Sequence, residues 1–138
     1  MSGDDIKHIV QTRVRYAECD PQNVAHHSAY VIWLEMARTE LLRKRGVSYR
    51  DLEATGVMFV VVRLNLRYRR PAFYDDVLDI HVHELVEARL KSGGIKLEHD
   101  YEIRRAGEVI AKAQTTLACV DREGKLQRIP EGALGLDG

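Results

Sequence analysis

The sequence predicts an α+β domain in which a five-stranded antiparallel sheet wraps around one long helix. Two observations carry this prediction. From Ala29 to Arg45, apolar residues recur at helical spacing and cover more of the circumference than a surface helix shows. After residue 57, most segments alternate apolar and polar side chains, as half-buried strands do. With 138 residues, the chain can build one compact core and not two, so we expect a single domain over residues 1–138.

The expected elements follow this order along the chain. A first strand is expected over residues 8–16, where β-branched and polar residues mix. The long helix begins near Ser28 as N-cap and ends at Gly46, after basic residues that suit a helix C-terminus. A short helix follows from Tyr49 to Thr55. Four long strands separated by Gly, Pro and Asp turns are then expected to form an antiparallel meander, over 57–70, 77–88, 95–105 and 109–121.

Composition excludes several classes of protein. The 21 Lys and Arg residues balance 21 Asp and Glu residues, which argues against a nucleic-acid partner. Cys19 and Cys119 show neither disulfide nor metal-ligand spacing. No apolar run approaches the ~20 residues that cross a bilayer, and the polar start lacks a signal-peptide pattern. We expect a cytoplasmic protein without a membrane span, with loose tails at residues 1–7 and 131–138.

Two stretches carry a family pattern. Residues 16–40 read YAECDPQNVAHHSAYVIWLEMARTE, with a Tyr four residues before Asp20, a His seven residues after it, and then E-x-A-R-x-E. Residues 68–78 read YRRPAFYDDVL. Together they resemble the hotdog-fold thioesterases of the 4-hydroxybenzoyl-CoA and Tol–Pal-associated acyl-CoA type, over roughly residues 8–130. The resemblance implies the hotdog fold and hydrolysis of a small-to-medium acyl-CoA to free acid and CoA. No cofactor is expected, since coenzyme A is part of the substrate.

Asp20 is the expected centre of the chemistry. Pro21 disfavours the helical region for Asp20 and so places a turn just ahead of the helix. By spacing alone, a turn or capping aspartate is the better interpretation, whereas the family resemblance favours catalysis. A carboxylate here can attack the thioester carbonyl as a nucleophile or activate water as a general base. The sequence leaves these two mechanisms open.

The helix N-terminus supplies the expected stabiliser of negative charge. Its free backbone N–H groups, at His27 and Ser28, form a natural oxyanion site. The resemblance adds the side chains of His27 and Tyr16 to the catalytic group. His27 would orient Asp20, position water, or contribute only its N–H. A strand-end tyrosine packed on the helix is an almost equal interpretation of Tyr16.

Coenzyme A carries phosphates, so its site calls for basic residues. The resemblance places nucleotide contacts at Arg89, Lys91 and Ser92, in an expected strand turn. An ordinary solvated turn explains these residues equally well. The arginines within residues 67–70 are a weaker alternative.

The resemblance also implies a homodimer or tetramer, with sheets joined edge to edge and sites at the interface. Val60 and Val61, in the strand after the helices, are then expected to line the acyl pocket. Two positions depart from the family pattern. Asn23 stands where many relatives have Gly, and Asn tolerates a positive φ better than most residues. His26 stands where hydroxybenzoyl-specific relatives have an aromatic wall, which leaves the acyl specificity open.

Other interpretations of the motif residues are weaker. Adjacent histidines point in different directions and lack a third ligand at helical spacing, so no metal site is expected at His26 and His27. Cys19 has no evident partner as a nucleophile, and Arg38 is interpreted as part of a buried or interfacial pair with a glutamate. Two other functions remain: a non-catalytic protein that binds acyl-CoA or acyl carrier protein, and an enoyl-CoA hydratase or dehydratase.

Overall fold

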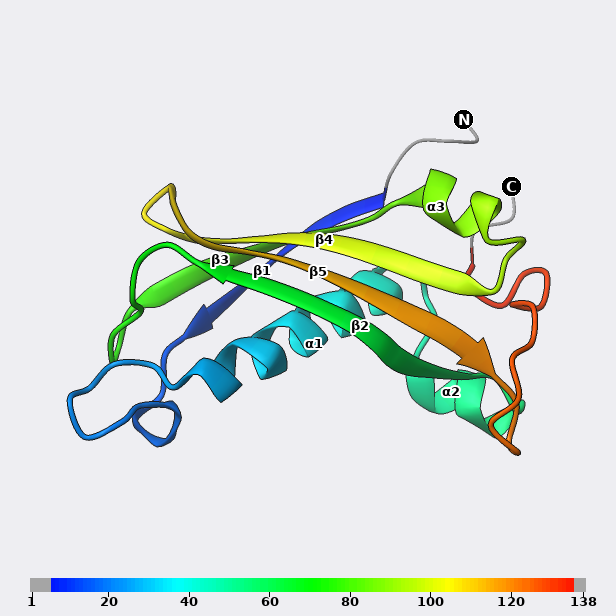
Figure 1. Cartoon of the computed structure of the whole chain (residues 1–138), viewed down its shortest axis with the longest axis horizontal. Coiled ribbons are helices and arrows are strands. Elements are labelled where there is room, and N and C mark those ends of the chain that lie inside the picture. The colour runs from blue at the N-terminus through cyan, green and yellow to red at the C-terminus, as the bar shows by residue number, and fades with distance from the viewer. Residues whose placement is uncertain (1–5, 136–138) are drawn as a thin grey trace.

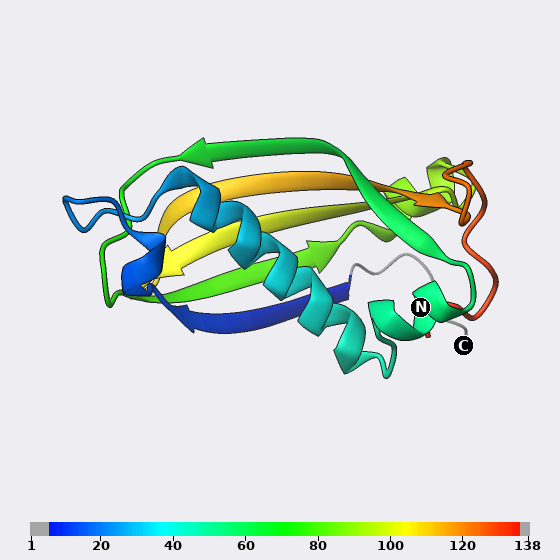
Figure 2. The same ribbon diagram turned by 90° about the horizontal axis from the view of Figure 1, so that it is seen from below.

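A curved five-stranded antiparallel sheet wraps a long helix in the computed structural model, which describes residues 6–135 (Figure 1). The expected α+β architecture is thereby confirmed. The helix α1 crosses the concave face of the sheet at a diagonal, as Figure 2 shows. The elements in chain order are β1 (Ile6–Arg13), the 3-10 helix η1 (Tyr16–Glu18), α1 (His27–Lys44), α2 (Tyr49–Ala54), β2 (Met58–Tyr68), β3 (Val77–Glu84), α3 (Val86–Lys91), β4 (Lys96–Arg105) and β5 (Glu108–Val120).

One face of α1 forms the main core with the sheet. Trp33, Leu34 and Ala37 are fully buried on this face. They share a hydrophobic cluster with the inward side chains of the sheet, among them Leu78 and Ile80 of β3. Burying a side chain of this size stabilises the fold by about 1.5–3 kcal/mol. The helical apolar pattern therefore anchors α1 to the sheet and fixes where its N-terminus lies.

The opposite face of α1 is exposed. Val31, Ile32 and Met36 keep 42%, 48% and 37% of their surface in contact with solvent. The expectation that so apolar a helix is surrounded on most sides is therefore not met within one chain, because the sheet is curved enough to cover only one side of it. Contiguous apolar surface of this kind is typical of an interaction site.

The strand order is β1-β3-β4-β5-β2. The strands β3, β4 and β5 follow one another as expected for a meander, but the expected meander is wrong for β2. That strand pairs with β5, from Met58 opposite Val120 to Tyr68 opposite Ala111, so residues 69–76 lead from one edge strand to β3 near the other edge. Turn residues show where a chain reverses, not which strand it meets afterwards.

The strand expected through Ala88 is also wrong in its last part. The strand β3 ends at Glu84, and the helix α3 follows at once. The sequence EARLK in α3 consists of good helix formers, which outweigh the weak alternation seen at this point. Gly93 and Gly94, with φ of 73° and 81°, then lead the chain out of the helix and into β4.

The expectation of loose tails is wrong for Ile6, Lys7 and Leu134. Ile6 and Lys7 belong to β1 and lie opposite residues of β3. Leu134 is only 3% exposed and packs in a second hydrophobic cluster with residues of α2 and β4. Residues 1–5 and 136–138 lie outside the described part of the chain. No helix within residues 6–135 is long and apolar enough to span a bilayer.

A histidine is buried inside this fold without charge. Burial, followed by the nearby guanidinium groups of Arg38 and Arg45, lowers the pKa of His99 to about 3. The Nδ1 atom of His99 has almost no exposure to solvent and no hydrogen-bond partner within residues 6–135. The unfolded chain takes up this proton near pH 6.5 and the folded chain does not. The stability that the neutral ring provides is therefore complete above pH 6.5 and declines as the pH falls toward 3.

We therefore predict that the free energy of unfolding falls in acid, and that replacing His99 removes part of this fall. Between pH 7 and pH 5, protonation of unfolded His99 should cost about 2 kcal/mol of unfolding free energy. Denaturant titrations at both pH values measure this loss, and the variant His99→Gln should show a loss smaller by about that amount. The matched control is His8→Gln, because His8 is a half-buried histidine of β1. Equal pH dependence in the wild type and His99→Gln would contradict the prediction.

Candidate active site

A short loop between η1 and α1 carries Asp20. Its two arms pair through an isolated bridge between Cys19 and Ala25, and the Asp20 N–H donates to the Val24 carbonyl at 2.9 Å. Asn23 turns the loop with a φ of 64°, as expected for an asparagine that replaces glycine. In Figure 1 this loop projects beyond the N-terminal end of α1.

One of the two oxygens of the Asp20 carboxylate is hydrogen-bonded within this loop. Its Oδ1 atom accepts hydrogen bonds from the backbone N–H groups of Gln22 at 2.8 Å and Val24 at 3.1 Å. The turn role that spacing alone favoured is thus present. Within the described residues, Oδ2 makes no hydrogen bond, and the side chain is only partly buried. The arrangement holds the carboxylate by one oxygen and leaves the other oxygen open.

The N-terminus of α1 offers one open donor of the two expected. The N-cap is His26, two residues earlier than the expected Ser28: its Nδ1 accepts the Ser28 N–H at 3.3 Å and lies 2.9 Å from the Ser28 hydroxyl. The Ala29 N–H donates to the His26 carbonyl at 2.9 Å. In the part of the chain that the structure describes, the His27 N–H has no acceptor. It is therefore the donor available to an anion at this helix end.

The side chains of Tyr16 and His27 are not joined to Asp20 by hydrogen bonds among the described residues. Tyr16 belongs to η1 and not to a strand end, because β1 stops at Arg13; it is 72% exposed and meets the ring of Tyr74 edge-on at 5.6 Å. The His27 ring is exposed and stacks on that of His26 at 4.2 Å. Both side chains lie near the loop and point into solvent.

A groove runs along the start of α1. The Tyr68 hydroxyl at the end of β2 reaches the His27 carbonyl at 3.5 Å, and its ring meets that of Tyr30 edge-on at 4.8 Å. The groove has a volume of about 320 Å³ and is lined by Val24, Ala25, His27, Tyr30, Tyr68, Arg69, Arg70 and Pro71. Loop, helix start and strand end thus form one surface that can receive a ligand.

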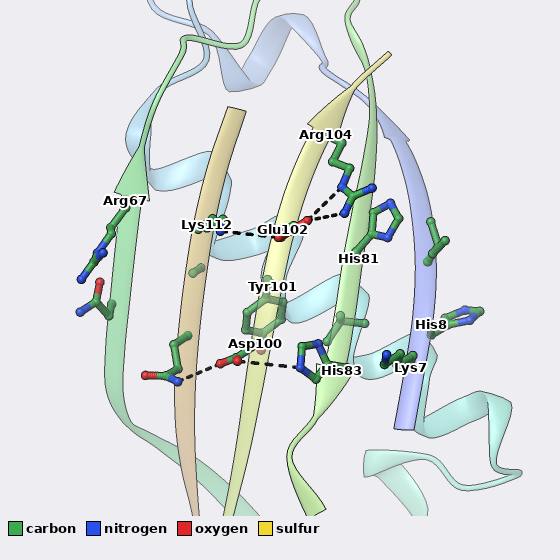
Figure 3. Close-up of a pocket in the computed structure, with 15 residues that line it drawn as sticks. Lys7, His8, Arg67, His81, His83, Asp100, Tyr101, Glu102, Arg104 and Lys112 are labelled. Atoms are coloured by element: carbon green, nitrogen blue, oxygen red, sulfur yellow. Dashed lines mark hydrogen bonds and ion pairs between the residues drawn. The ribbon is translucent and has the colours of Figure 1, made fainter. Parts of the chain in front are cut away.

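A larger cavity of about 550 Å³ lies on the other face of the sheet (Figure 3). Both of its carboxylates are paired within the cavity: Glu102 contacts Arg104 and Lys112, and Asp100 contacts His83 and Gln114. It contains no residue of α1 or of the Asp20 loop. The groove at α1 is the candidate active site, because Val24 of the Asp20 loop and His27, whose N–H is open, both line it, although Asp20 itself is not among its lining residues.

The residues expected to bind coenzyme A lie on α3 and not in a strand turn. Arg89 is mostly buried and lies 3.6 Å from the buried Glu84. The Ser92 hydroxyl accepts the N–H groups of Ile95 and Lys96 and donates to the Arg89 carbonyl, so it terminates the helix. Lys91 is exposed on the same turn and forms an ion pair with Glu87, at 3.1 Å.

The other predicted binding residues lie on the edge strand β2 or just after it. Val60 and Val61 are 44% and 48% exposed and belong to β2, an edge strand that within residues 6–135 pairs with a strand on one side only. Among the alternative arginines, Arg69 and Arg70 both line the groove at α1, and Arg70 also pairs with Glu108 at 2.8 Å. Arg67 belongs to the cavity on the outer face of the sheet.

The remaining motif residues have structural partners. Arg38 is buried and lies 3.9 Å from Glu35, which agrees with its interpretation as half of an ion pair. Partial burial and the neighbouring Glu18 and Asp20 carboxylates raise the pKa of the Cys19 thiol, which disfavours a nucleophilic thiolate. Within residues 6–135, no group of three or more His, Cys, Asp or Glu side chains is arranged to hold a metal ion.

Glu18 and Tyr68 are the residues of this region that sequence reasoning missed. Glu18 is 8% exposed and contacts Trp33, fifteen positions further along the chain. Tyr68 contacts His27 from forty-one positions away. Their places in the two family motifs, residues 16–40 and 68–78, are the only sequence signals for them, because both contacts arise from tertiary packing.

Comparison with known proteins places this geometry in a family. Residues 14–135 match the model of the thioesterase-like superfamily. The acyl-CoA thioester hydrolase YbgC of Escherichia coli O6:H1 is 36% identical over 110 residues, which cover 79% of this chain and 78% of the relative. The long-chain acyl-CoA thioesterase FadM of Escherichia coli K12 is 32% identical over 124 residues, which cover 90% of this chain and 91% of that protein. The crystal structure of a DHNA-CoA thioesterase from Staphylococcus aureus has a TM-score of 0.80 at 30% identity, covering 88% of this chain and 80% of that one.

A helix wrapped by an antiparallel sheet is the hotdog fold, and the relatives identify the chain as a thioester hydrolase with this fold. The chain belongs to the thioesterase-like superfamily, since the family model spans most of its length. It is an enzyme of the acyl-CoA thioesterase family within that superfamily. The family resemblance and the enzyme class predicted from the two motifs are confirmed.

Proposed function

We propose that this enzyme hydrolyses a small-to-medium acyl-CoA to the free acid and CoA, with Asp20 as the reacting carboxylate. The observation that carries the proposal is the open Oδ2 atom of Asp20 in the segment that leads directly to the open N–H of His27. The carboxylate faces the thioester carbon. The N–H and the positive end of the α1 dipole stabilise the oxygen on which negative charge develops.

Two routes use the same atoms. In the first, Asp20 Oδ2 attacks the carbonyl carbon, the C–S bond breaks, and CoA leaves as a thiolate that takes up a proton. Water then cleaves the mixed anhydride and restores the carboxylate. In the second, Asp20 removes a proton from water as the water attacks the carbonyl, the C–S bond then breaks, and the departing CoA thiolate takes up that proton. The side chains of His27 and Tyr16 complete the site by orienting water or substrate once the ligand excludes solvent.

The active unit is proposed to be a dimer joined through the β2 edge. The open edge of β2 presents Val60, Val61, Val62 and Leu64, each between 42% and 55% exposed, beside the uncovered face of α1. An edge strand this apolar invites pairing with a second copy. Pairing would cover the valines and turn Val60 and Val61 into walls of an acyl pocket shared by two chains.

The proposed coenzyme A contacts are divided between two places. Lys91 is exposed and free to exchange Glu87 for a phosphate, whereas Arg89, mostly buried beside Glu84, would add positive charge close to it. Ser92 contributes by fixing the end of α3 on which both basic residues depend. Arg69, in the groove at α1, is the alternative partner for a phosphate.

A panel of acyl-CoA substrates tests the proposed function. Acetyl-, hexanoyl-, palmitoyl- and benzoyl-CoA are incubated with the enzyme, and free thiol is measured with a thiol reagent. We expect release with saturation kinetics, fastest for one of the shorter substrates. Binding without thiol release across the panel would indicate a non-catalytic acyl-CoA-binding protein. Hydration of crotonyl-CoA without thiol release would indicate a hydratase.

A label separates the two routes. A single turnover in H₂¹⁸O, followed by mass spectrometry of the peptide that contains Asp20, shows whether the label enters the carboxylate. Incorporation into Asp20 is expected for the anhydride route, because water attacking at the aspartyl carbon leaves its oxygen there. Label found only in the acid product would indicate general-base catalysis or attack of water at the acyl carbon.

A further inference from the structure

A second carboxylate, Glu18, is buried two residues before Asp20. Its side chain is 6% exposed and closes the 3-10 turn η1. The Oε1 atom accepts the Arg15 backbone N–H at 2.8 Å. The Oε2 atom accepts the Trp33 indole N–H at 2.9 Å and the Arg15 guanidinium at 3.2 Å. Both oxygens are therefore used, one for the turn itself and one to tie the turn to α1.

The backbone of Glu18 holds the other end of the same loop. Its carbonyl accepts the N–H of His26, the N-cap of α1, at 2.7 Å. The side chain of Glu18 thus reaches Trp33 in the second turn of α1, while its carbonyl reaches the residue just before the helix. Asp20 lies between these attachments. On the side of the loop that faces α1, Glu18 therefore sets the position of the Asp20 carboxylate relative to the His27 N–H.

The loop has a second set of attachments, away from the helix. Val24 forms a bridge with Phe73, the Ala25 N–H donates to the Ala72 carbonyl at 2.8 Å, and the Asn23 carbonyl accepts the Tyr74 N–H at 2.9 Å. These bonds hold the loop to the segment between β2 and β3. Loss of the Glu18 bonds would therefore leave the loop folded but free to shift relative to α1.

The chemistry of Glu18 suits a permanent acceptor. Burial raises the pKa of Glu18, but hydrogen bonds from Arg15 and Trp33 outweigh burial and the net pKa is lowered. The carboxylate therefore stays ionised at neutral pH, and its bonds to the indole and the guanidinium are charge-assisted. The Trp33 ring is completely buried among core side chains, so the indole N–H is a fixed point of attachment.

We propose that Glu18 is a positioning residue of the thioesterase, which sets the distance between the Asp20 carboxylate and the N-terminus of α1 through its bond to Trp33. The inference rests on the proposed role of Asp20. Glu18 does not touch the substrate and acts only through the loop. A small displacement of a reacting group costs about 10²-fold in rate when the stabilising donor stays behind.

The variants Glu18→Gln and Trp33→Phe test the proposal. A glutamine keeps the shape of Glu18 but offers one carbonyl oxygen to three N–H donors, and phenylalanine removes the indole donor while keeping an aromatic ring. With the acyl-CoA that the wild type cleaves fastest, we expect kcat to fall ~10- to 100-fold while KM changes less than about threefold. In the double variant the two losses should not multiply, because both break one contact.

Two controls separate positioning from simple destabilisation. Tyr101→Phe removes another buried hydrogen bond, that between the Tyr101 and Thr115 hydroxyls at 2.7 Å, well inside the sheet. It should lower the melting temperature but leave kcat unchanged. The inference is overturned if Glu18→Gln keeps a kcat within twofold of the wild type, or if kcat falls equally in Tyr101→Phe. The variant Asp20→Asn distinguishes failure of the positioning role from failure of the proposed mechanism. An inactive Asp20→Asn with a fully active Glu18→Gln refutes the positioning role alone. An active Asp20→Asn refutes the proposed mechanism.

Discussion

Replacing Asp20 with asparagine is expected to lower kcat for thioester hydrolysis by at least about 10³-fold with little effect on folding. The amide oxygen can still accept the N–H groups of Gln22 and Val24, so the turn should keep its shape. The amide nitrogen would occupy the place of Oδ2, which contacts no donor in the described chain. The charge and the lone pairs of that oxygen disappear, and with them both the nucleophile and the general base.

Thiol release from the best acyl-CoA substrate measures the loss, and denaturant titration checks that stability changes by less than about 0.5 kcal/mol, as for a surface substitution. The matched control is Asp75→Asn. Asp75, like Asp20, lies in a turn. Its φ is 73°, and its carboxylate pairs with Arg13. That variant should keep its activity. Turnover by Asp20→Asn near the wild-type rate would exclude Asp20 as the reacting group.

A charge on the open edge of β2 is expected to separate the proposed dimer and to lower activity with it. Leu64 is 42% exposed at this edge, where the two-fold axis of a dimer would bring two copies of an introduced charge together. The variant Leu64→Asp should weaken association by about 2 kcal/mol or more, about 30-fold in Kd. Sedimentation velocity over a range of protein concentrations, combined with the activity assay, measures both effects.

The other edge of the sheet supplies the control. Ile9, on β1, is 55% exposed but lies among polar neighbours such as Lys7 and Gln11. The variant Ile9→Asp should leave the oligomeric state unchanged. Dissociation by Ile9→Asp and not by Leu64→Asp would place the interface at β1 and refute the shared pocket at Val60 and Val61.

Local patterns carried much of the fold. The apolar residues of α1 recur so regularly that the helix was predicted within two residues of its observed bounds, His27–Lys44. Apolar and polar residues alternate just as regularly in the strands, and this alternation predicted where the strands lie. Asp20 was predicted in a turn because Pro21 restricts the residue before it, and the loop indeed closes around Asp20.

Errors arose where two local tendencies compete or where pairing is long-range. The segment Val86–Lys91 alternates weakly but contains strong helix formers, and the helix formed. The pairing of β2 with β5 joins residues about fifty positions apart, which no turn signal encodes. The interpretation of Arg89 and Ser92 as residues of a strand turn was wrong. The sequence did not reveal that Arg89 contacts the buried Glu84 and that Ser92 caps the end of α3.

The sequence by itself determined the fold class, the enzyme family and the loop that carries Asp20, because each depends on periodicity or on neighbours a few positions apart. Only the tertiary structure decided which oxygen of Asp20 is open and which N–H of α1 is free, since these depend on how hydrogen bonds are shared within the folded loop. It also brought Glu18 against Trp33. A contact across fifteen residues exists only after η1 packs against α1, and on this contact depends the proposed positioning of the Asp20 carboxylate.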